Sequence, residues 1–219
     1  MTPKDRIAAR AAKELMDGDI VNLGIGLPTQ IPQYLPPDVE ITLQSENGFL
    51  GLGPLDGTPV QNLVNAGGNP CGISPGAAFF DSAMSFALIR GGHIDVTILG
   101  GLQVDQHGNL ANWKVPGKMV PGMGGAMDLV TGARKVIVVM EHCAKDGSPK
   151  ILDRCSLPLT ALAKVHRIIT ELAVFDIQDD KLILQEIAPD LSIESLAQKT
   201  GATFVISNTL AEMIQGAST

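Results

Sequence analysis

Apolar residues recur at two spacings along the chain, and these spacings predict alternating helices and strands. Helical spacing predicts one helix over 4–17, which begins after a capping box formed by Thr2 and Asp5. Two further helices are expected, from 81–82 to Ile89 and from Ser192 to Lys199. Short apolar or alternating runs predict strands at 20–23, 39–44, 94–99, 136–140 and 204–206.

This alternation predicts an α/β protein with a layered open sheet, largely parallel, with an antiparallel edge and helices on both faces. The antiparallel edge is expected at 167–177 and 181–187, which flank a turn at 178–180. One or two helical turns are predicted at 209–214. The sequence has no repeat, linker or domain boundary, so we predict a single domain over 1–219.

Two long segments, 48–76 and 109–125, are dense in Gly, Pro or Asn and predict irregular structure. Long irregular connections within compact domains are usually functional, so both are candidate parts of a site. A shorter glycine turn, Gly24-x-Gly26, follows the strand predicted at 20–23, and Pro28 stands where a helix could begin. Glycine turns at the carboxyl ends of strands suit an anionic ligand, although a tight turn alone is the commoner role.

Composition narrows the classes of function. The chain has 219 residues, 45% of them apolar, with eight aromatic residues (one Trp, one Tyr and six Phe) and a formal net charge of −7. We therefore expect neither a base-stacking surface nor a basic surface for nucleic acid. No apolar run approaches the length of a signal core or a membrane span, so we expect a soluble protein without a membrane partner. The three cysteines are widely spaced, which favours a reducing, cytoplasmic location.

Glu46 is the most informative single residue. It stands at the carboxyl end of the strand predicted at 39–44 and is followed at once by Asn47 and Gly48, so its carboxylate is expected at the rim of the sheet. A carboxylate there is a candidate nucleophile or base. Local sequence alone leaves this open, because a lone carboxylate is more often a solvated loop residue or a helix cap.

The run Glu141-His142-Cys143 has the residue types of a thiol site or a metal site. Neighbouring residues on a strand point to opposite faces, so a structural role is favoured for His142 and Cys143. The remaining histidines have no ligand spacing to one another, and no metal is expected.

Beyond these local patterns, the stretch SENGFLGLGP at 45–54 resembles the B (beta) subunit of class I 3-oxoacid coenzyme A transferases, the acetate/acetoacetate and succinyl-CoA:acetoacetate group. The resemblance extends over about 4–206. Further segments similar to that family follow in the family's order: NAG (65–67), PGAA (75–78), IRGGHID (89–95), LANW (110–113), PGKMV (116–120), GMGGAMDL (122–129), MEHCAK (140–145) and RIITE (167–171).

The resemblance implies roles for particular residues. Glu46 is implied to be the nucleophile, and the backbone of Gly124 and Gly125 to hold the developing oxyanion. Contacts with the coenzyme or substrate are implied for Asn22, Asn47, Gly48 and Asn112. Some relatives of the mitochondrial type carry Lys directly after Asn-Ala-Gly, whereas Gly68 stands here, so that coenzyme contact is expected to differ.

The same resemblance implies a reaction. Coenzyme A would move between an acyl-CoA, such as acetyl-CoA or succinyl-CoA, and a 3-oxoacid such as acetoacetate, as in ketone-body and short-chain fatty-acid metabolism. The route is ping-pong through a glutamyl-CoA thioester, with coenzyme A as a substrate and no cofactor. The implied partner is the family's alpha (A) subunit, in an α2β2 heterotetramer. Two alternatives stay open: a thioester hydrolase that uses the same glutamate, and a non-catalytic module that binds phosphorylated metabolites.

Overall fold

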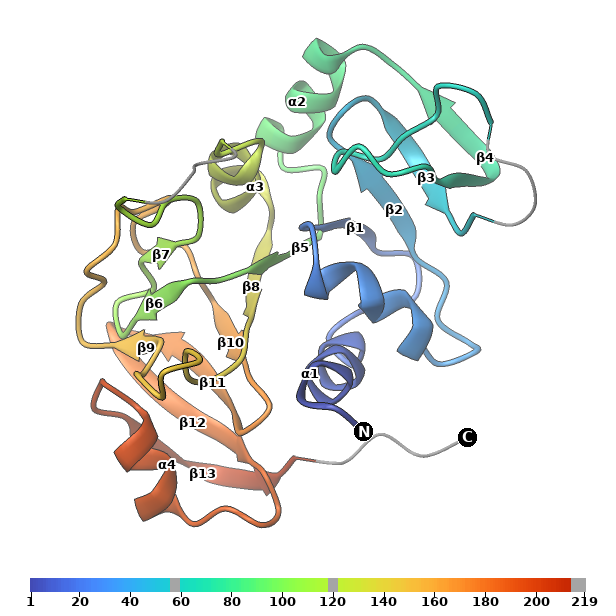
Figure 1. The fold of residues 1–219 in the computed structure, drawn as a ribbon. Coiled ribbons are helices and arrows are strands. Elements are labelled where there is room, and N and C mark those ends of the chain that lie inside the picture. The colour runs from blue at the N-terminus through green and yellow to red at the C-terminus, as the bar shows by residue number, and fades with distance from the viewer. Residues whose placement is uncertain (56–59, 118–121, 214–219) are drawn as a thin grey trace.

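The apolar runs of the sequence form the middle of a ten-stranded sheet in the computed structural model, which describes residues 1–55, 60–117 and 122–213 (Figure 1). Its spatial order is β13-β12-β11-β10-β8-β5-β1-β2-β3-β4. The ten strands are β1 (Ile20–Leu23), β2 (Thr42–Ser45), β3 (Phe49–Gly53), β4 (Gly72–Phe79), β5 (Val96–Gly100), β8 (Lys135–Val139), β10 (Arg167–Ile169), β11 (Ala173–Gln178), β12 (Lys181–Ile187) and β13 (Val205–Glu212).

The five central strands, β10, β8, β5, β1 and β2, run parallel, and antiparallel pairs flank them on both sides. On one side β2, β3 and β4 form antiparallel pairs. On the other side β11 pairs antiparallel with both β10 and β12. A hairpin turn joins β11 to β12 and contains Asp179 and Asp180, both with positive φ. The last strand, β13, pairs parallel with β12. The predicted fold class is therefore confirmed.

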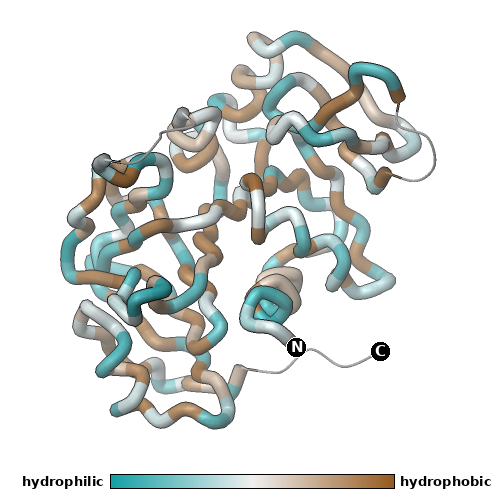
Figure 2. Tube along the Cα trace, in the orientation of Figure 1, coloured by the Kyte–Doolittle hydropathy of each residue, from teal (hydrophilic) through white to brown (hydrophobic). Residues whose placement is uncertain are grey.

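Helices cover both faces of the sheet because its central strands are apolar on both sides. In β8, Val136 and Val138 face one core, whereas Ile137 and Val139 face the other. Figure 2 shows this hydrophobic character along the central strands. The first core packs against α2 (Ser82–Arg90) and α3 (Ala126–Gly132), and the second against α1 (Pro3–Ala12) and the 3-10 helix η1 (Leu27–Tyr34). The last helix, α4 (Ile193–Lys199), joins the first core through Leu196.

The predicted helix starts are confirmed by their caps. Thr2 and Asp5 form the capping box of α1, and the side chains of Asp81 and Ser192 accept backbone N–H groups at the starts of α2 and α4. The first helix is shorter than predicted, however. It ends at Ala12 instead of residue 17 because the chain must turn there to enter β1, and Gly18 adopts a φ of +83° in that turn.

Three further expectations are corrected. Segment 48–76, predicted to be irregular, contains β3 and β4; residues 56–59 lie outside the described residues. Segment 109–125 contains the short strand β7 (Leu110–Ala111), which forms a three-stranded sheet with β6 (Gln103–Asp105) and β9 (Ile151–Leu152); residues 118–121 are likewise not described. The helical turn predicted at 209–214 is strand β13 as far as Glu212, because the open edge of β12 accepts a strand there; Ile214 is not described.

In the part of the chain that the structure describes, no helix combines the length and hydrophobicity needed to cross a bilayer. The single domain predicted over 1–219 stays a prediction.

A buried ionic cluster joins α1 to the amino ends of the parallel strands. The side chain of Glu14 is only 4% exposed, and it binds Arg10 at 2.7 Å, Lys135 at 2.7 Å and Arg167. Burial acts to raise the pKa of Glu14, but the hydrogen bond from Lys135 and the charges of Arg10 and Arg167 outweigh it and lower that pKa from 4.5 to about 2. The ionised form of Glu14 is therefore favoured by folding.

We expect Glu14→Gln to destabilise the protein by about 3 kcal/mol at pH 7, because three cations, of which Arg10 is buried, lose the buried anion that they share. The lowered pKa means that the stabilisation is present above about pH 4.5 and is lost as the pH falls toward 2. The difference in free energy of unfolding between wild type and variant, measured by urea denaturation, should therefore become smaller as the pH is lowered. Asp128→Asn, which breaks the exposed pair with Arg90, is the control and should change stability little. A constant difference from pH 7 to pH 3 would contradict this assignment.

Candidate active site

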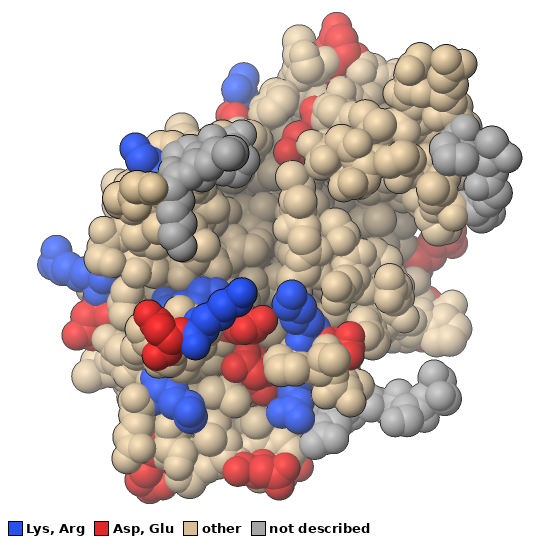
Figure 3. Space-filling view, viewed as in Figure 1, with Lys and Arg blue, Asp and Glu red and all other residues tan. Residues whose placement is uncertain are grey.

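The carboxyl ends of the central parallel strands open into a cleft of about 1940 Å³. The connection that leaves β1 leads to β2, on one side of β1 in the sheet, whereas β5 lies on the other side of β1 and is followed in this sheet by β8. The connections from β1 and β5 therefore diverge above the middle of the sheet. Such a divergence creates a crevice for ligands in open α/β sheets. Figure 3 shows the hollow, with walls that are mostly uncharged and with charged side chains gathered along one rim.

Glu46 lies in this cleft, directly after the last residue of β2. Its side chain is half-buried, and its Oε2 accepts a hydrogen bond of 3.2 Å from Nδ2 of Asn22, on the neighbouring strand β1. The register of β1 and β2, which sets Asn22 opposite Gln44, brings these two side chains to the same edge. The structure thus joins two residues that are 24 positions apart in the sequence.

A tight turn fixes the direction in which Glu46 projects. Gly48 has a φ of +133°, donates its N–H to the carbonyl of Ser45 at 3.0 Å and accepts the N–H of Phe80 at 2.9 Å. A Cβ atom at Gly48 would lie 2.4 Å from the carbonyl oxygen of Phe80, so only glycine fits. The hydroxyl of Ser45 donates to Asn47 at 2.6 Å and accepts the N–H of Ala66 at 3.0 Å, which ties the turn to the next loop.

Gly125, at the start of α3, lies against the side chain of Glu46. A Cβ atom at Gly125 would be 3.3 Å from Oε1 of Glu46 and 3.4 Å from the ring of Phe86. The missing side chain therefore lets the backbone approach the carboxylate closely. Gly124, the preceding residue, has a φ of +57°, in the left-handed region that glycine adopts readily.

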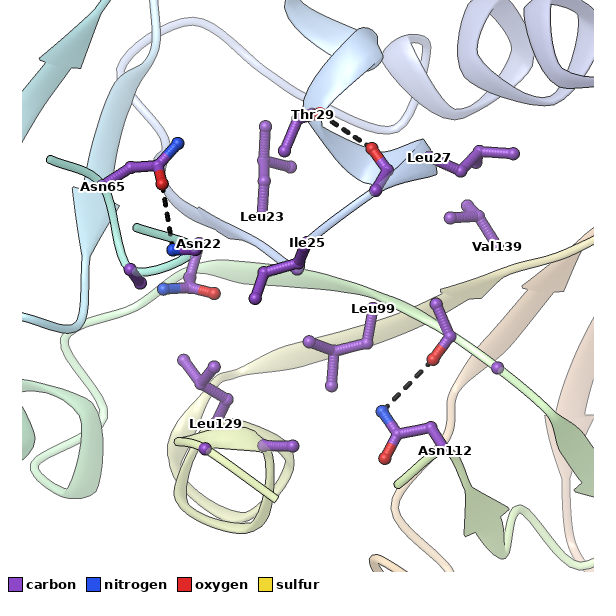
Figure 4. A pocket seen from close by; sticks show the side chains of 18 of the residues that line it. Asn22, Leu23, Ile25, Leu27, Thr29, Asn65, Leu99, Asn112, Leu129 and Val139 are labelled. Carbon is purple, nitrogen blue, oxygen red and sulfur yellow. Dashed lines mark hydrogen bonds between the residues drawn. The ribbon is translucent and has the colours of Figure 1, made fainter. Parts of the chain in front are cut away.

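Asn112 reaches the cleft from the small sheet. Its Nδ2 donates to the carbonyl of Gly100 at 3.2 Å, and its Oδ1 accepts the hydroxyl of Thr160 at 2.6 Å. Figure 4 shows Asn22 and Asn112 separated by the apolar side chains of Ile25 and Leu99. The site thus has polar groups at separate points of a largely apolar surface, an arrangement typical of small-molecule sites.

The predicted site residues divide into two groups. Asn22, Glu46, Asn112, Gly124 and Gly125 all line the cleft. Asn47 and Gly48 build the adjoining turn instead and are not among the residues that line it, so the contacts implied for them stay predictions.

Two residues that hold the site together were not predicted, Gln44 and Ser85. Both are buried, and Nε2 of Gln44 donates to the hydroxyl of Ser85 at 3.0 Å. The sequence did contain one indication: Gln44 is two residues before Glu46, and alternate residues of a strand share a face.

His142 has the structural role that was favoured for it. It is fully buried, and its two ring nitrogens lie 3.0 Å from the hydroxyls of Thr170 and Thr200. Burial, together with the charges of Lys199 and Lys150, lowers the pKa of His142 to about 4, so the ring is neutral near pH 7. Within the described residues, no three His, Cys, Asp or Glu side chains are grouped in a way that could hold a metal ion.

Comparisons with known proteins identify relatives of this chain. The family model described as Coenzyme A transferase matches residues 4–199. The beta subunit of acetate CoA-transferase from Escherichia coli (strain K12) is 68% identical over 206 residues, which cover 94% of this chain and 95% of that protein. The B subunit of succinyl-CoA:3-ketoacid coenzyme A transferase from Helicobacter pylori (strain ATCC 700392 / 26695) is 52% identical over 205 residues, or 93% of this chain and 99% of that protein.

Solved structures show the same fold. The apoenzyme of an acyl-CoA transferase from Escherichia coli O157:H7 matches with a TM-score of 0.78 and 27% identity, over 98% of this chain and 44% of that chain. The present chain thus spans less than half of that longer protein. Glutaconate coenzyme A-transferase from Acidaminococcus fermentans matches with a TM-score of 0.72 over 100% of this chain and 90% of that chain, and at 19% identity it is informative for the fold alone.

The turn after Glu46 provides a test of this geometry. Gly48→Ala should destabilise the protein by at least about 2 kcal/mol, since the new Cβ atom meets a backbone carbonyl at an unfavourable φ. Gly100→Ala is the matched control: this glycine also lies at the cleft, but a Cβ atom there has open space, so a change within about 0.5 kcal/mol is expected. Thermal and urea denaturation would measure both. A loss of stability for Gly48→Ala as small as the one expected for Gly100→Ala would show that the turn tolerates a side chain.

Proposed function

Because the chain belongs to the coenzyme A transferase family, we propose that it is the beta subunit of an enzyme that moves coenzyme A between an acyl-CoA and a carboxylic acid, with Glu46 as the nucleophile. The observation that carries this proposal is the placement of Glu46. Its carboxylate lies at the end of a parallel strand, inside the large cleft, with an amide N–H on one oxygen and a glycine backbone against the other.

The first half-reaction needs only this carboxylate. An oxygen of Glu46 attacks the thioester carbonyl of the acyl-CoA, and the C–S bond breaks. Coenzyme A leaves as its thiolate, and Glu46 and the acyl group are now joined as a mixed anhydride. The thiolate then attacks the glutamyl carbonyl, the anhydride C–O bond breaks, and the acyl group departs as a free carboxylate. Glu46 now carries coenzyme A as a thioester.

The second half-reaction reverses these steps with a different acid. The acceptor carboxylate attacks the glutamyl thioester and expels the thiolate, which attacks the acceptor carbonyl of the new anhydride and restores the Glu46 carboxylate. Atoms and charge balance without a proton donor, and one thioester replaces another. For that chemical reason we propose that no metal or organic cofactor takes part and that coenzyme A is a substrate.

Each step places negative charge on a carbonyl oxygen, and we assign its stabilisation to groups beside Glu46. Asn22 already donates to Oε2, and the backbone N–H groups of Gly124 and Gly125 are the proposed donors on the Oε1 side. One such donor is worth about 10²–10³ in rate in a comparable enzyme.

Hydrolysis of the reactive anhydride must also be avoided. Leu23, Ile25, Leu99 and Leu129 line the cleft, and such apolar walls exclude water and strengthen the electrostatic interactions within it.

The substrates are proposed from the relatives. One relative is named as an acetate CoA-transferase and another as a succinyl-CoA:3-ketoacid coenzyme A transferase. The structure of the acyl-CoA transferase of Escherichia coli O157:H7 has also been solved as a thioester complex with CoA. We propose a short-chain acyl-CoA, such as acetyl-CoA or succinyl-CoA, and a 3-oxoacid such as acetoacetate. Asn112, on the far side of the cleft, is the proposed polar contact for the coenzyme or its thioester.

The names of the relatives also bear on assembly. Each is named as the beta or B chain of its enzyme, which implies a partner alpha subunit. We propose an α2β2 heterotetramer, and we place it in the cytoplasm because Cys71, Cys143 and Cys155 are all free thiols.

The central test is Glu46→Gln, assayed in the complex with the partner subunit. Turnover of acetoacetyl-CoA with acetate should fall at least about 10³-fold, and the wild type alone should gain a mass adduct of the size of coenzyme A. Glu212→Gln, at an exposed carboxylate on β13 that is not among the residues lining the cleft, is the matched control and should keep both properties. If Glu46→Gln still turns over and still gains the adduct, the nucleophile is wrong.

The same assay separates a transferase from a thioester hydrolase. Consumption of the thioester should depend on added acetate and should stop when acetate is omitted. Consumption without any acceptor acid would identify a hydrolase that uses the same glutamate.

Assembly can be tested by light scattering on the co-expressed subunits. The expected mass corresponds to two copies of each chain, and the chain alone should lack transferase activity. A one-to-one complex with full activity would contradict the tetramer and leave the chemistry intact.

A further inference from the structure

A row of buried polar side chains crosses the sheet beneath Glu46. Thr97 on β5, Asn22 on β1 and Gln44 on β2 are partners in the strand register, and Ser85 on α2 lies at the end of the row. Their exposed fractions are between 0% and 2%. On β5 and β1 the direct neighbours of Thr97 and Asn22 are apolar, whereas on β2 the polar residue Ser45 follows Gln44. The polar row therefore crosses strands that are apolar in the middle of the sheet.

The hydrogen bonds in this row have a defined direction. Nε2 of Gln44 donates to the hydroxyl of Ser85 at 3.0 Å, which turns Oε1 of Gln44 toward Asn22. That oxygen accepts Nδ2 of Asn22 at 2.6 Å, and the same nitrogen donates to Oε2 of Glu46 at 3.2 Å. Each amide has one donor end and one acceptor end, so the orientation of Gln44 determines the orientation of Asn22.

Two buried polar atoms in this row have no hydrogen-bond partner among the described residues. Oδ1 of Asn22 and the hydroxyl of Thr97 both lack a hydrogen bond within the described structure. Unpaired buried oxygens are rare in native proteins and call for an explanation. The explanation offered by the geometry is that the nitrogen of Asn22, not its oxygen, has to face Glu46.

We infer that Gln44 is a positioning residue for the transfer reaction. It holds the amide of Asn22 so that an N–H faces the glutamyl oxygen in the carboxylate and in each oxyanion formed at that carbon, and Ser85 holds Gln44 in turn. Without the acceptor at Gln44, the amide of Asn22 can rotate and present its oxygen to the anionic site, which repels it. The inference rests on the proposed role of Glu46 as the nucleophile.

The first test is Gln44→Met, a change to an unbranched apolar side chain of similar length, made in the complex with the partner subunit. With acetoacetyl-CoA and acetate we expect kcat to fall about 10–100-fold, because the loss of orientation weakens one oxyanion donor. KM for both substrates should stay within about twofold, since Gln44 is only 2% exposed and offers little surface to substrate. Ser85→Ala removes less volume and should give a smaller fall in kcat with the same unchanged KM.

Thr200→Val is the matched control for lost stability. Thr200 is also buried and hydrogen-bonded, to His142 and to the carbonyl of Leu196, but it is not among the residues that line the cleft. It should lower the melting temperature and leave kcat unchanged. Equal falls in kcat for Thr200→Val and Gln44→Met would overturn the inference.

A double-mutant cycle with Asn22→Ala isolates the route of the effect. If Gln44 acts through Asn22, the double variant should lose no more activity than Asn22→Ala alone, which we expect to lose about 10²-fold. Full additivity, or full activity of both Gln44→Met and Ser85→Ala, would overturn the positioning role. If the positioning role fails in this way while Glu46→Gln is inactive, the proposed transferase function still holds. An active Glu46→Gln variant would instead overturn the proposed function.

Discussion

The register between β1 and β2 is the constraint on which the site depends. It places Asn22 opposite Gln44, and because alternate residues of a strand share a face, Glu46 then projects beside the same amide nitrogen. A shift of one residue would turn both Gln44 and Glu46 to the other face, into the core packed by α1. The hydrophobic pattern of the parallel strands fixes this register, so the packing that folds the sheet also brings the proposed catalytic groups together.

The two edges of the parallel sheet carry opposite kinds of electrostatics. At the amino ends, Glu14 is neutralised by three cations, so its charge is satisfied internally and joins α1 to the sheet. At the carboxyl ends, Glu46 meets no cation in the described structure, only an amide N–H and a glycine backbone. A carboxylate paired with cations would be a poor nucleophile, whereas hydrogen-bond donors alone orient it and leave its lone pairs usable.

Buried polar groups are tolerated where the proposed chemistry requires them. The row from Thr97 to Ser85 occupies positions that hydrophobic side chains could fill, and it leaves two oxygens unpaired within the described structure. The row around His142 makes an instructive contrast, because both ring nitrogens there have threonine partners. The unpaired oxygens near Glu46 and the paired nitrogens of His142 fit the catalytic role proposed for the first group and the structural role of the second.

The sequence by itself determined the apolar strands, the caps at Thr2, Asp81 and Ser192, the α/β class and, through the resemblance at 45–54, the candidate glutamate. These features depend on neighbours within a few residues, which periodicity and local motifs record. Tertiary structure alone decided that β3 and β4 extend the sheet, that 209–212 is a strand, and that Gln44 and Ser85 support Asn22. Each of those outcomes depends on a backbone or side-chain partner far away in the chain, and such a partner is chosen by which segments the folded core brings within hydrogen-bonding distance.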